Sequence, residues 1–275
     1  MKTEDTKTTA LINLLQDDNQ RIASMAMEQL LKHETMLDET IAEYQESEDP
    51  RLRQRLHQLS SILARRRYQR DLVAALRDKS ITLWQGICRL NQLYDPNCSQ
   101  SQITDMVNSL AEESDRALSN SSRLASFMKE ADFTVPLHIP LDIDVYLIES
   151  VLDFRMGSSA VLCALAQNLA WMNGNLSTNI VLYEARFCLT DNSHHLIDPA
   201  AWWRVSKLED TKDIHPCSRQ DVWLGILSQM FLIAVTDGNL YDTHYLSKLL
   251  TELNGDPLSS LPHPLGDKES TLQNR

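Results

Sequence analysis

The sequence predicts an α+β protein that is predominantly α-helical. Glycine accounts for only 7 of the 275 residues, and apolar residues recur at helical spacing through most of the chain, as in residues 52–63. Residues 179–189 instead have the apolar and aromatic character of a strand, and a second, shorter strand ends at Pro199. These patterns favour many helices around a small antiparallel sheet.

Composition and charge restrict the classes of partner. Apolar residues make up 43% and charged residues 23% of the chain, which is ordinary for a globular protein with a sizeable core. The formal net charge of −12 argues against nucleic acid or an anionic membrane as the main partner. The longest apolar candidate, residues 222–235, falls short of the roughly 18 residues that a membrane span needs.

The cysteines and the N-terminal residues predict a cytoplasmic location. Five cysteines form an odd set with no CxxC pair, which favours reduced thiols over a disulfide framework. The first residues lack the apolar segment of a secretion signal. No glycine-rich phosphate loop or dinucleotide fingerprint is present, so we expect no cofactor.

Residues 1–79 are expected to form a helical region, and whether it folds separately from the rest is left open. Residues 19–30 and 49–60 can be overlaid, because each stretch has a short polar cap, an aliphatic residue three positions on and an amphipathic helix. This internal similarity predicts a pair of HEAT-like hairpins, although the 30-residue step is shorter than the usual ~40 residues. A plain helical bundle is the alternative.

The rest of the chain is expected to continue as helices interrupted by one group of strands. The helical pattern ends with two helices joined by a tight turn at residues 237–239, which has the length of one TPR-like hairpin. The predicted elements are helices at 80–93, 102–118, 123–131, 145–154, 158–172, 220–236 and 242–253, an extended loop at 134–144 and a polar loop at 206–218. We therefore expect a core at 80–205, a helical hairpin at 206–255 and a disordered tail at 256–275.

Several short motifs, taken in order, resemble the SirB-type transglutaminase-like family. Residues 147–152 (Leu-Ile-Glu-Ser-Val-Leu) with residues 155–157 (Arg-Met-Gly) are similar to the family's helix end, residues 196–199 (Leu-Ile-Asp-Pro) to its isoleucine–aspartate–proline strand, and residues 222–254 to its C-terminal hairpin. The resemblance covers residues 80–255 and implies a transglutaminase-like core with a small antiparallel sheet.

The same resemblance indicates where a catalytic triad would lie. A nucleophilic cysteine at the start of the core helix corresponds to Ser159, the histidine to Arg186, and the aspartate to Asp198. A serine needs a strong neighbouring base, and a guanidinium stays protonated and accepts no proton. The sequence thus predicts an Arg186–Asp198 ion pair in place of catalysis.

A thiol-based site remains the alternative. Cys163 lies one helical turn after Ser159, and His194 or His195 with Asp198 would complete a triad. Strand alternation would place His194 and Asp198 on one face. The competing interpretation is that Cys163 is a small buried apolar residue, because its sequence neighbours are apolar.

A metal site is not expected. His194, His195, Asp198, His215 and Cys217 fall within 24 residues, but adjacent residues of a strand point to opposite faces and do not chelate together.

These patterns favour a non-catalytic protein-interaction or regulatory protein, with an acyl-transfer or peptidase-type enzyme as the alternative. Helical repeats commonly bind peptides, and an acidic surface favours basic protein or peptide partners. Trp171, Trp202, Trp203 and Trp223 are expected either to pack in the core or to anchor such a partner in a groove. The oligomeric state is left open.

Overall fold

A computed structural model describes most of the chain. The described residues are 2–32, 41, 44, 47–78, 80–94, 98–114, 118–137, 142–174, 177–208 and 214–255. The tail expected to be disordered, residues 256–275, lies outside these ranges. Within the described ranges, every helix is too short or too polar to cross a bilayer.

The chain divides into two compact units, residues 1–71 and residues 72–275. The division falls inside the long helix α4 (Pro50–Arg77), and the expected core and C-terminal hairpin share the second unit. The first unit also contains α1 (Lys2–Leu14) and α2 (Gln20–Leu31). Asn19 is the N-cap of α2, in agreement with the polar cap predicted at this position. Its apolar core consists of Ile12, Leu15, Ala26, Leu30, Ile41, Leu52, Leu56, Leu59 and Leu63. The HEAT-like interpretation stays a prediction.

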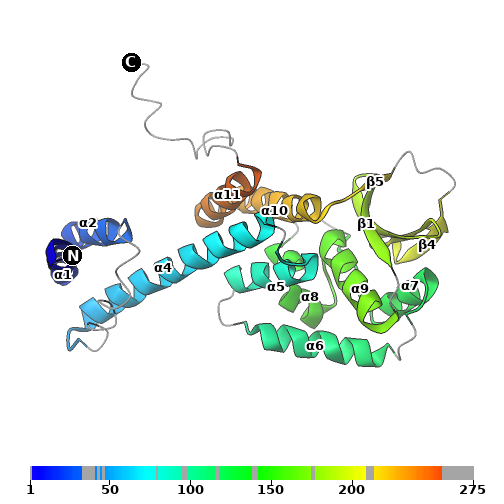
Figure 1. Cartoon of the computed structure of the whole chain (residues 1–275), viewed down its shortest axis with the longest axis horizontal. Coiled ribbons are helices and arrows are strands. Elements are labelled where there is room, and N and C mark those ends of the chain that lie inside the picture. The colour runs from blue at the N-terminus through cyan, green and yellow to red at the C-terminus, as the bar shows by residue number, and fades with distance from the viewer. Residues whose placement is uncertain are drawn as a thin grey trace, which may run out of the picture. The chain divides into compact units, whose positions relative to one another are not determined.

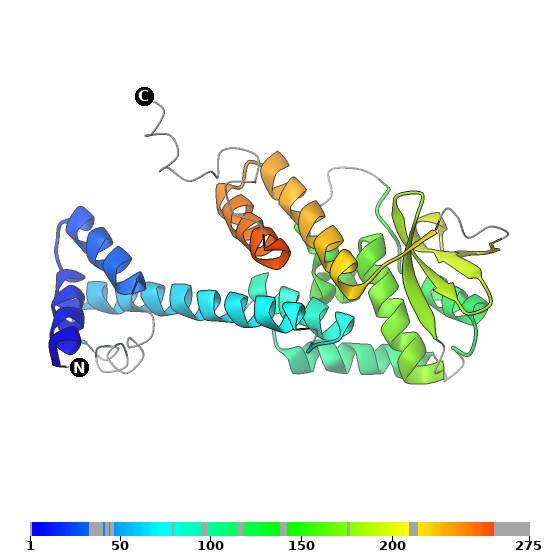
Figure 2. The same cartoon turned by 45° about the horizontal axis from the view of Figure 1, so that its top comes forward.

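The second unit is built around one buried helix, α9 (Ser159–Gly174). All residues from 160 to 166 are buried, because helices and the sheet pack around α9. Its neighbours are visible in Figures 1 and 2. The other helices of this unit are α5 (Leu83–Tyr94), α6 (Gln100–Glu113), α7 (Ser121–Glu130), α8 (Ile148–Phe154), α10 (Arg219–Thr236) and α11 (Leu240–Asn254).

A five-stranded antiparallel sheet lies against α9, in agreement with the predicted α+β class. Its order is β4-β3-β2-β1-β5. The strands are β1 (Thr178–Tyr183), β2 (Arg186–Asp191), β3 (His195–Asp198), β4 (Arg204–Lys207) and β5 (Ile214–Pro216).

The single strand predicted over residues 179–189 is wrong, because the chain turns back at Glu184 and Ala185. Both residues have positive φ angles, 47° and 60°, as a two-residue hairpin turn requires. Such turns usually contain glycine or asparagine, so this one leaves no signal in the sequence. The polar loop predicted at 206–218 is also partly wrong, because β4 ends and β5 lies within it.

Two further expectations about the helices are resolved. Residues 143–146 form a 3₁₀ helix, and Leu147 separates them from α8. The α-helix predicted at 145–154 therefore begins at Ile148, three residues later than predicted. The predicted hairpin of α10 and α11 is present, and Gly238 takes the left-handed conformation (φ 69°) in its turn. The TPR-like interpretation of this hairpin stays a prediction.

Side-chain alternation gives the sheet two different faces. On one face, Val181, Cys188 and Leu196 form a small buried cluster with Tyr183, Leu208 and Ile214. On the other face lie Ile180, Leu189 and Ile197, which the strand register places side by side. The second face also carries Phe187, which lines a pocket together with the first residues of α9. We call it the helix face, and the first one the outer face.

Candidate functional site

The N-terminus of α9 is fixed by the serine that precedes it. The Ser158 hydroxyl accepts a hydrogen bond from the Val161 N–H at 3.3 Å, and the Ser158 N–H donates to the Val145 carbonyl at 2.8 Å. Serine is a favoured N-cap because its side chain satisfies one of the free N–H groups of the first turn. Ser159 is therefore the first residue of the helix.

A pocket of about 240 Å³ opens at this helix terminus. One wall is the Phe187 ring, and Gly225 of α10 lets that ring approach, because a Cβ atom at position 225 would lie 2.6 Å from the ring. The lining residues are Val135, Pro136, Tyr146, Ser158, Ser159, Ala160, Ala185, Phe187, Gly225, Ile226 and Gln229. None of these side chains is ionised at neutral pH.

Tyr146 lines this pocket. The residue is only 4% exposed, and among the described residues its hydroxyl has no hydrogen-bond partner. Burial raises the pKa of Tyr146 to about 12, so the phenol keeps its proton at neutral pH. The Ser159 hydroxyl also has no partner within the described part of the chain.

Arg186 and Asp198 meet on the outer face of the sheet. Nη2 of Arg186 lies 3.5 Å from Oδ2 of Asp198 and 2.9 Å from Oε2 of Glu184. Oδ1 of Asp198 accepts the N–H groups of Ala200 at 2.9 Å and Ala201 at 3.3 Å, at the start of a short 3₁₀ helix (Pro199–Ala201). Asp198 is 3% exposed, so its carboxylate is committed to these donors.

The structure does not bring Ser159 together with this ion pair. Phe187 faces Ser159 across the pocket, and its neighbour Arg186 points to the opposite face, because successive strand residues alternate. The register of β2 and β3 pairs Leu189 with Ile197, so Asp198 lies opposite Cys188. Asp198 is therefore on the outer face as well. The sheet therefore separates the nucleophile position from both of its expected partners.

Cys163 is enclosed on the helix face. It is fully buried, and its thiol donates a weak hydrogen bond to the Phe187 carbonyl at 3.5 Å. Burial, with smaller contributions from Cys188 and Asp198, raises the pKa of the Cys163 thiol well above its ordinary value. A thiol in this state is a poor nucleophile because the thiolate is the reactive form.

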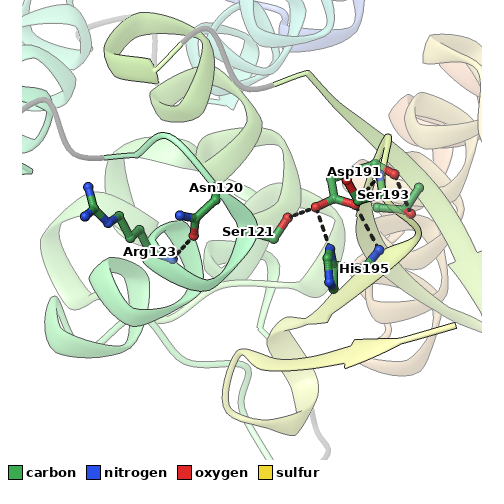
Figure 3. A network of polar contacts seen from close by, with 7 residues as sticks. Asn120, Ser121, Arg123, Asp191, Ser193 and His195 are labelled. Carbon is green, nitrogen blue, oxygen red and sulfur yellow. Dashed lines mark hydrogen bonds and ion pairs between the residues drawn. The ribbon is translucent and has the colours of Figure 1, made fainter.

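The two histidines do not complete a triad with Cys163 and Asp198. His194 is exposed and has a φ of 61°, so it lies in the turn before β3 and the expected strand alternation does not extend to it. His195 is bound through Nδ1 to Oδ2 of Asp191 at 2.9 Å. Figure 3 shows that Asp191 also accepts hydrogen bonds from the Ser121 hydroxyl and from the N–H groups of Ser193 and His195. This network ties α7 to the turn between β2 and β3.

Among the described residues, no three His, Cys, Asp or Glu side chains converge as metal ligands. All five cysteines are free thiols.

The tryptophans divide between core and surface. Trp203 is buried and donates from Nε1 to the Phe133 carbonyl at 2.6 Å, and Trp223 is buried where Gly86 lets α5 and α10 approach. Trp202 is 59% and Trp171 is 72% exposed. Trp171 borders a groove of about 520 Å³ whose lining also includes Trp84, Gln85, Gln167 and Asn168.

Comparisons of the chain with protein-family models, with curated proteins and with solved structures give no significant match. The geometry of the site is therefore the basis for its chemistry. The sequence did not reveal two residues of the site. Tyr146 lies in an apolar stretch that resembles any core segment, and the position of Phe187 depends on the turn at residues 184 and 185, which contains no typical turn residue.

The Asp191 network predicts a defined loss of stability in acid. Burial raises the pKa of Asp191, but hydrogen bonds from Ser121 and His195 outweigh it and lower the pKa to about 2. Because the folded-state pKa lies below the ordinary value of 3.8, the carboxylate stabilises the fold above pH 4 and this contribution disappears as the pH falls towards 2. Asp191→Asn should lower the free energy of unfolding at pH 7 by about 2 kcal/mol.

Urea titrations at pH 7, 5 and 3 measure this effect, with tryptophan fluorescence as the signal because all five tryptophans lie in the second unit. The difference between wild type and Asp191→Asn should shrink towards pH 3. Asp153→Asn, an exposed control on α8, should leave stability unchanged at each pH. A difference for Asp191→Asn that stays constant with pH would contradict the assignment.

Proposed function

We propose that the protein is a non-catalytic protein-interaction or regulatory protein, built on a degenerate transglutaminase-like core and acting in the cytoplasm. The observation that carries the proposal is the separation of Ser159 and Cys163 on the helix face from Asp198 and Arg186 on the outer face. A nucleophile, a base and the group that orients the base have to be in hydrogen-bond reach of one another.

The pocket at the start of α9 supports this proposal because its described lining offers no general base. A serine hydroxyl reacts only when a neighbouring group removes its proton. The polar side chains that line the pocket are hydroxyls and one amide, from Tyr146, Ser158, Ser159 and Gln229, and none of them accepts a proton at neutral pH. Phe187 occupies the strand position that faces Ser159.

The buried thiols support it as well. Burial is the main cause that raises the pKa of Cys163 well above the ordinary value and that of Cys188 to about 12, with Asp198 adding to both shifts. Enzymes that use a cysteine do the reverse and lower the pKa of the thiol. Cys163 and Cys188 therefore fit an apolar packing role better than a nucleophilic one.

The groove beside Trp171 supports an interaction role. Exposed tryptophans are unfavourable in water and frequently anchor protein partners. This groove combines the indole rings of Trp84 and Trp171 with the amides of Gln85, Gln167 and Asn168, which suits an extended peptide that offers apolar side chains and backbone hydrogen bonds. The net charge of −12 favours a peptide with basic residues.

Reactivity probes test the non-catalytic core. With the full chain at pH 7, a chloroacetamide probe should label Cys163 and Cys188 only as fast as unfolding exposes them, and Cys217, the one cysteine that is only half-buried, should react first. A fluorophosphonate probe should not label Ser159. Peptide mapping by mass spectrometry measures both, and heat-unfolded protein provides the full-labelling control. Rapid labelling of Cys163 that is lost in His194→Ala or His195→Ala would instead establish the thiol enzyme.

Two exposed tryptophans provide a matched test of the partner groove. Proteins captured from cells by the tagged chain should be retained by Trp202→Ala and lost with Trp171→Ala, because Trp171 lines the groove and Trp202 does not. Binding should also weaken as salt is raised, since charge attraction between an acidic protein and a basic peptide is screened. Equal capture by wild type and both variants would contradict the groove assignment.

A further inference from the structure

We propose that the pocket at the N-terminus of α9 binds the carboxylate of a small ligand with an apolar body, supplied either as a free short-chain carboxylic acid or as the C-terminal residue of a peptide. This proposal deepens the proposed function and rests on it, because it treats the former nucleophile position as a binding site.

Unsatisfied hydrogen-bond donors converge on the pocket. The N–H groups of Ser159 and Ala160 belong to the first turn of a 16-residue helix and have no acceptor in the described part of the chain. The Ser159 hydroxyl is likewise unpaired among the described residues. These groups create a partial positive charge that favours an anion.

The Tyr146 hydroxyl is a second and independent indication of a ligand. Tyr146 reaches the pocket from the 3₁₀ helix before α8, so its position does not follow from α9. The residue is 4% exposed, and the described residues provide no hydrogen-bond partner for its hydroxyl. A ligand oxygen in the pocket would supply it.

The lining of the pocket selects a monocarboxylate. Among the described residues no lysine or arginine lines it, so a phosphate dianion would be left largely uncompensated, whereas the half-charge of a helix terminus with hydroxyl donors suits a single negative charge. The described lining has no acidic side chain either, which disfavours a cation. Val135, Pro136, Phe187 and Ile226 form an apolar wall for the rest of the ligand.

The volume sets the size of the ligand. At about 240 Å³, the pocket is smaller than the roughly 300–1,000 Å³ of sites for drug-sized molecules. It holds on the order of eight non-hydrogen atoms, if each takes about the 30 Å³ that a water molecule occupies in the liquid. A branched short-chain acid, or the carboxylate and side chain of one C-terminal valine, has this size.

Titrations followed by NMR test the proposal on the full chain. Isovalerate should bind, with dissociation constants of about millimolar for so small a ligand, and the neutral isosteric isovaleramide should bind at least about tenfold more weakly. The peptide Gly-Gly-Val and its C-terminal amide distinguish the two sources. Tighter binding of the free-acid peptide than of isovalerate identifies a peptide terminus, and the reverse identifies a free acid.

Variants connect the binding to the named groups. Tyr146→Phe removes only the hydroxyl and should weaken isovalerate binding about tenfold, and Ser159→Ala should weaken it as well. Tyr245→Phe, which removes the hydroxyl of another buried tyrosine in the same unit, is the matched control and should bind as wild type does. Because burial keeps the pKa of Tyr146 near 12, the affinity should stay constant from pH 6 to 9.

Equal binding of isovalerate and isovaleramide, unchanged binding by both Tyr146→Phe and Ser159→Ala, or no binding by the folded wild type would each overturn the carboxylate site. None of these results affects the non-catalytic core. Hydrolysis of the ethyl ester or the amide of isovalerate by the chain would be a separate result, and it would contradict the proposal that the core is non-catalytic.

Discussion

Side chains alternate between the two faces of an antiparallel sheet, and in the second unit this constraint decides which candidate residues can meet. Phe187 points to α9 and lines the pocket with Ser159, so Arg186 must point away from it. Arg186 pairs with Asp198 on the outer face, 3.5 Å away, and the described residues that line the start of α9 include no charged side chain. The register of β2 with its neighbouring strands therefore accounts for the ion pair, for the lack of a described base beside Ser159 and for the lack of charged side chains in the described lining of the pocket.

Each face has become specialised in a different way. On the outer face, Asp198 uses one oxygen to cap a 3₁₀ helix and the other to hold Arg186, above a buried cluster of Val181, Cys188 and Leu196. On the helix face, the enclosed Cys163 serves packing, while the pocket retains hydrogen-bond donors with no described protein acceptor. A helix N-terminus attracts a negative charge whether or not a neighbouring base activates a nucleophile there, so this position suits binding.

Much of this fold could be predicted from the sequence, and the parts that could not have physical causes. The apolar run of α9 and the α10–α11 hairpin with Gly238 follow from periodicity and from residues with marked backbone preferences. The turn at Glu184 and Ala185 has no such residue, so the strands were predicted as one. That error conceals the facing position of Phe187, and the left-handed conformation of His194 likewise removes it from the alternation that its sequence position implies. Local propensity did not determine these backbone conformations, which the packed sheet imposes.

The alternation at positions 186 and 187 can be measured directly with an introduced thiol. In Ser159→Cys, the rate of alkylation at position 159 against pH gives the pKa of that thiol, and a neighbouring imidazole would lower it. The structure predicts a lowered pKa when Ser159→Cys is combined with Phe187→His, and an unchanged one when it is combined with Arg186→His. Lowering of the pKa by Arg186→His and not by Phe187→His would place Arg186 opposite the start of α9 and contradict the account.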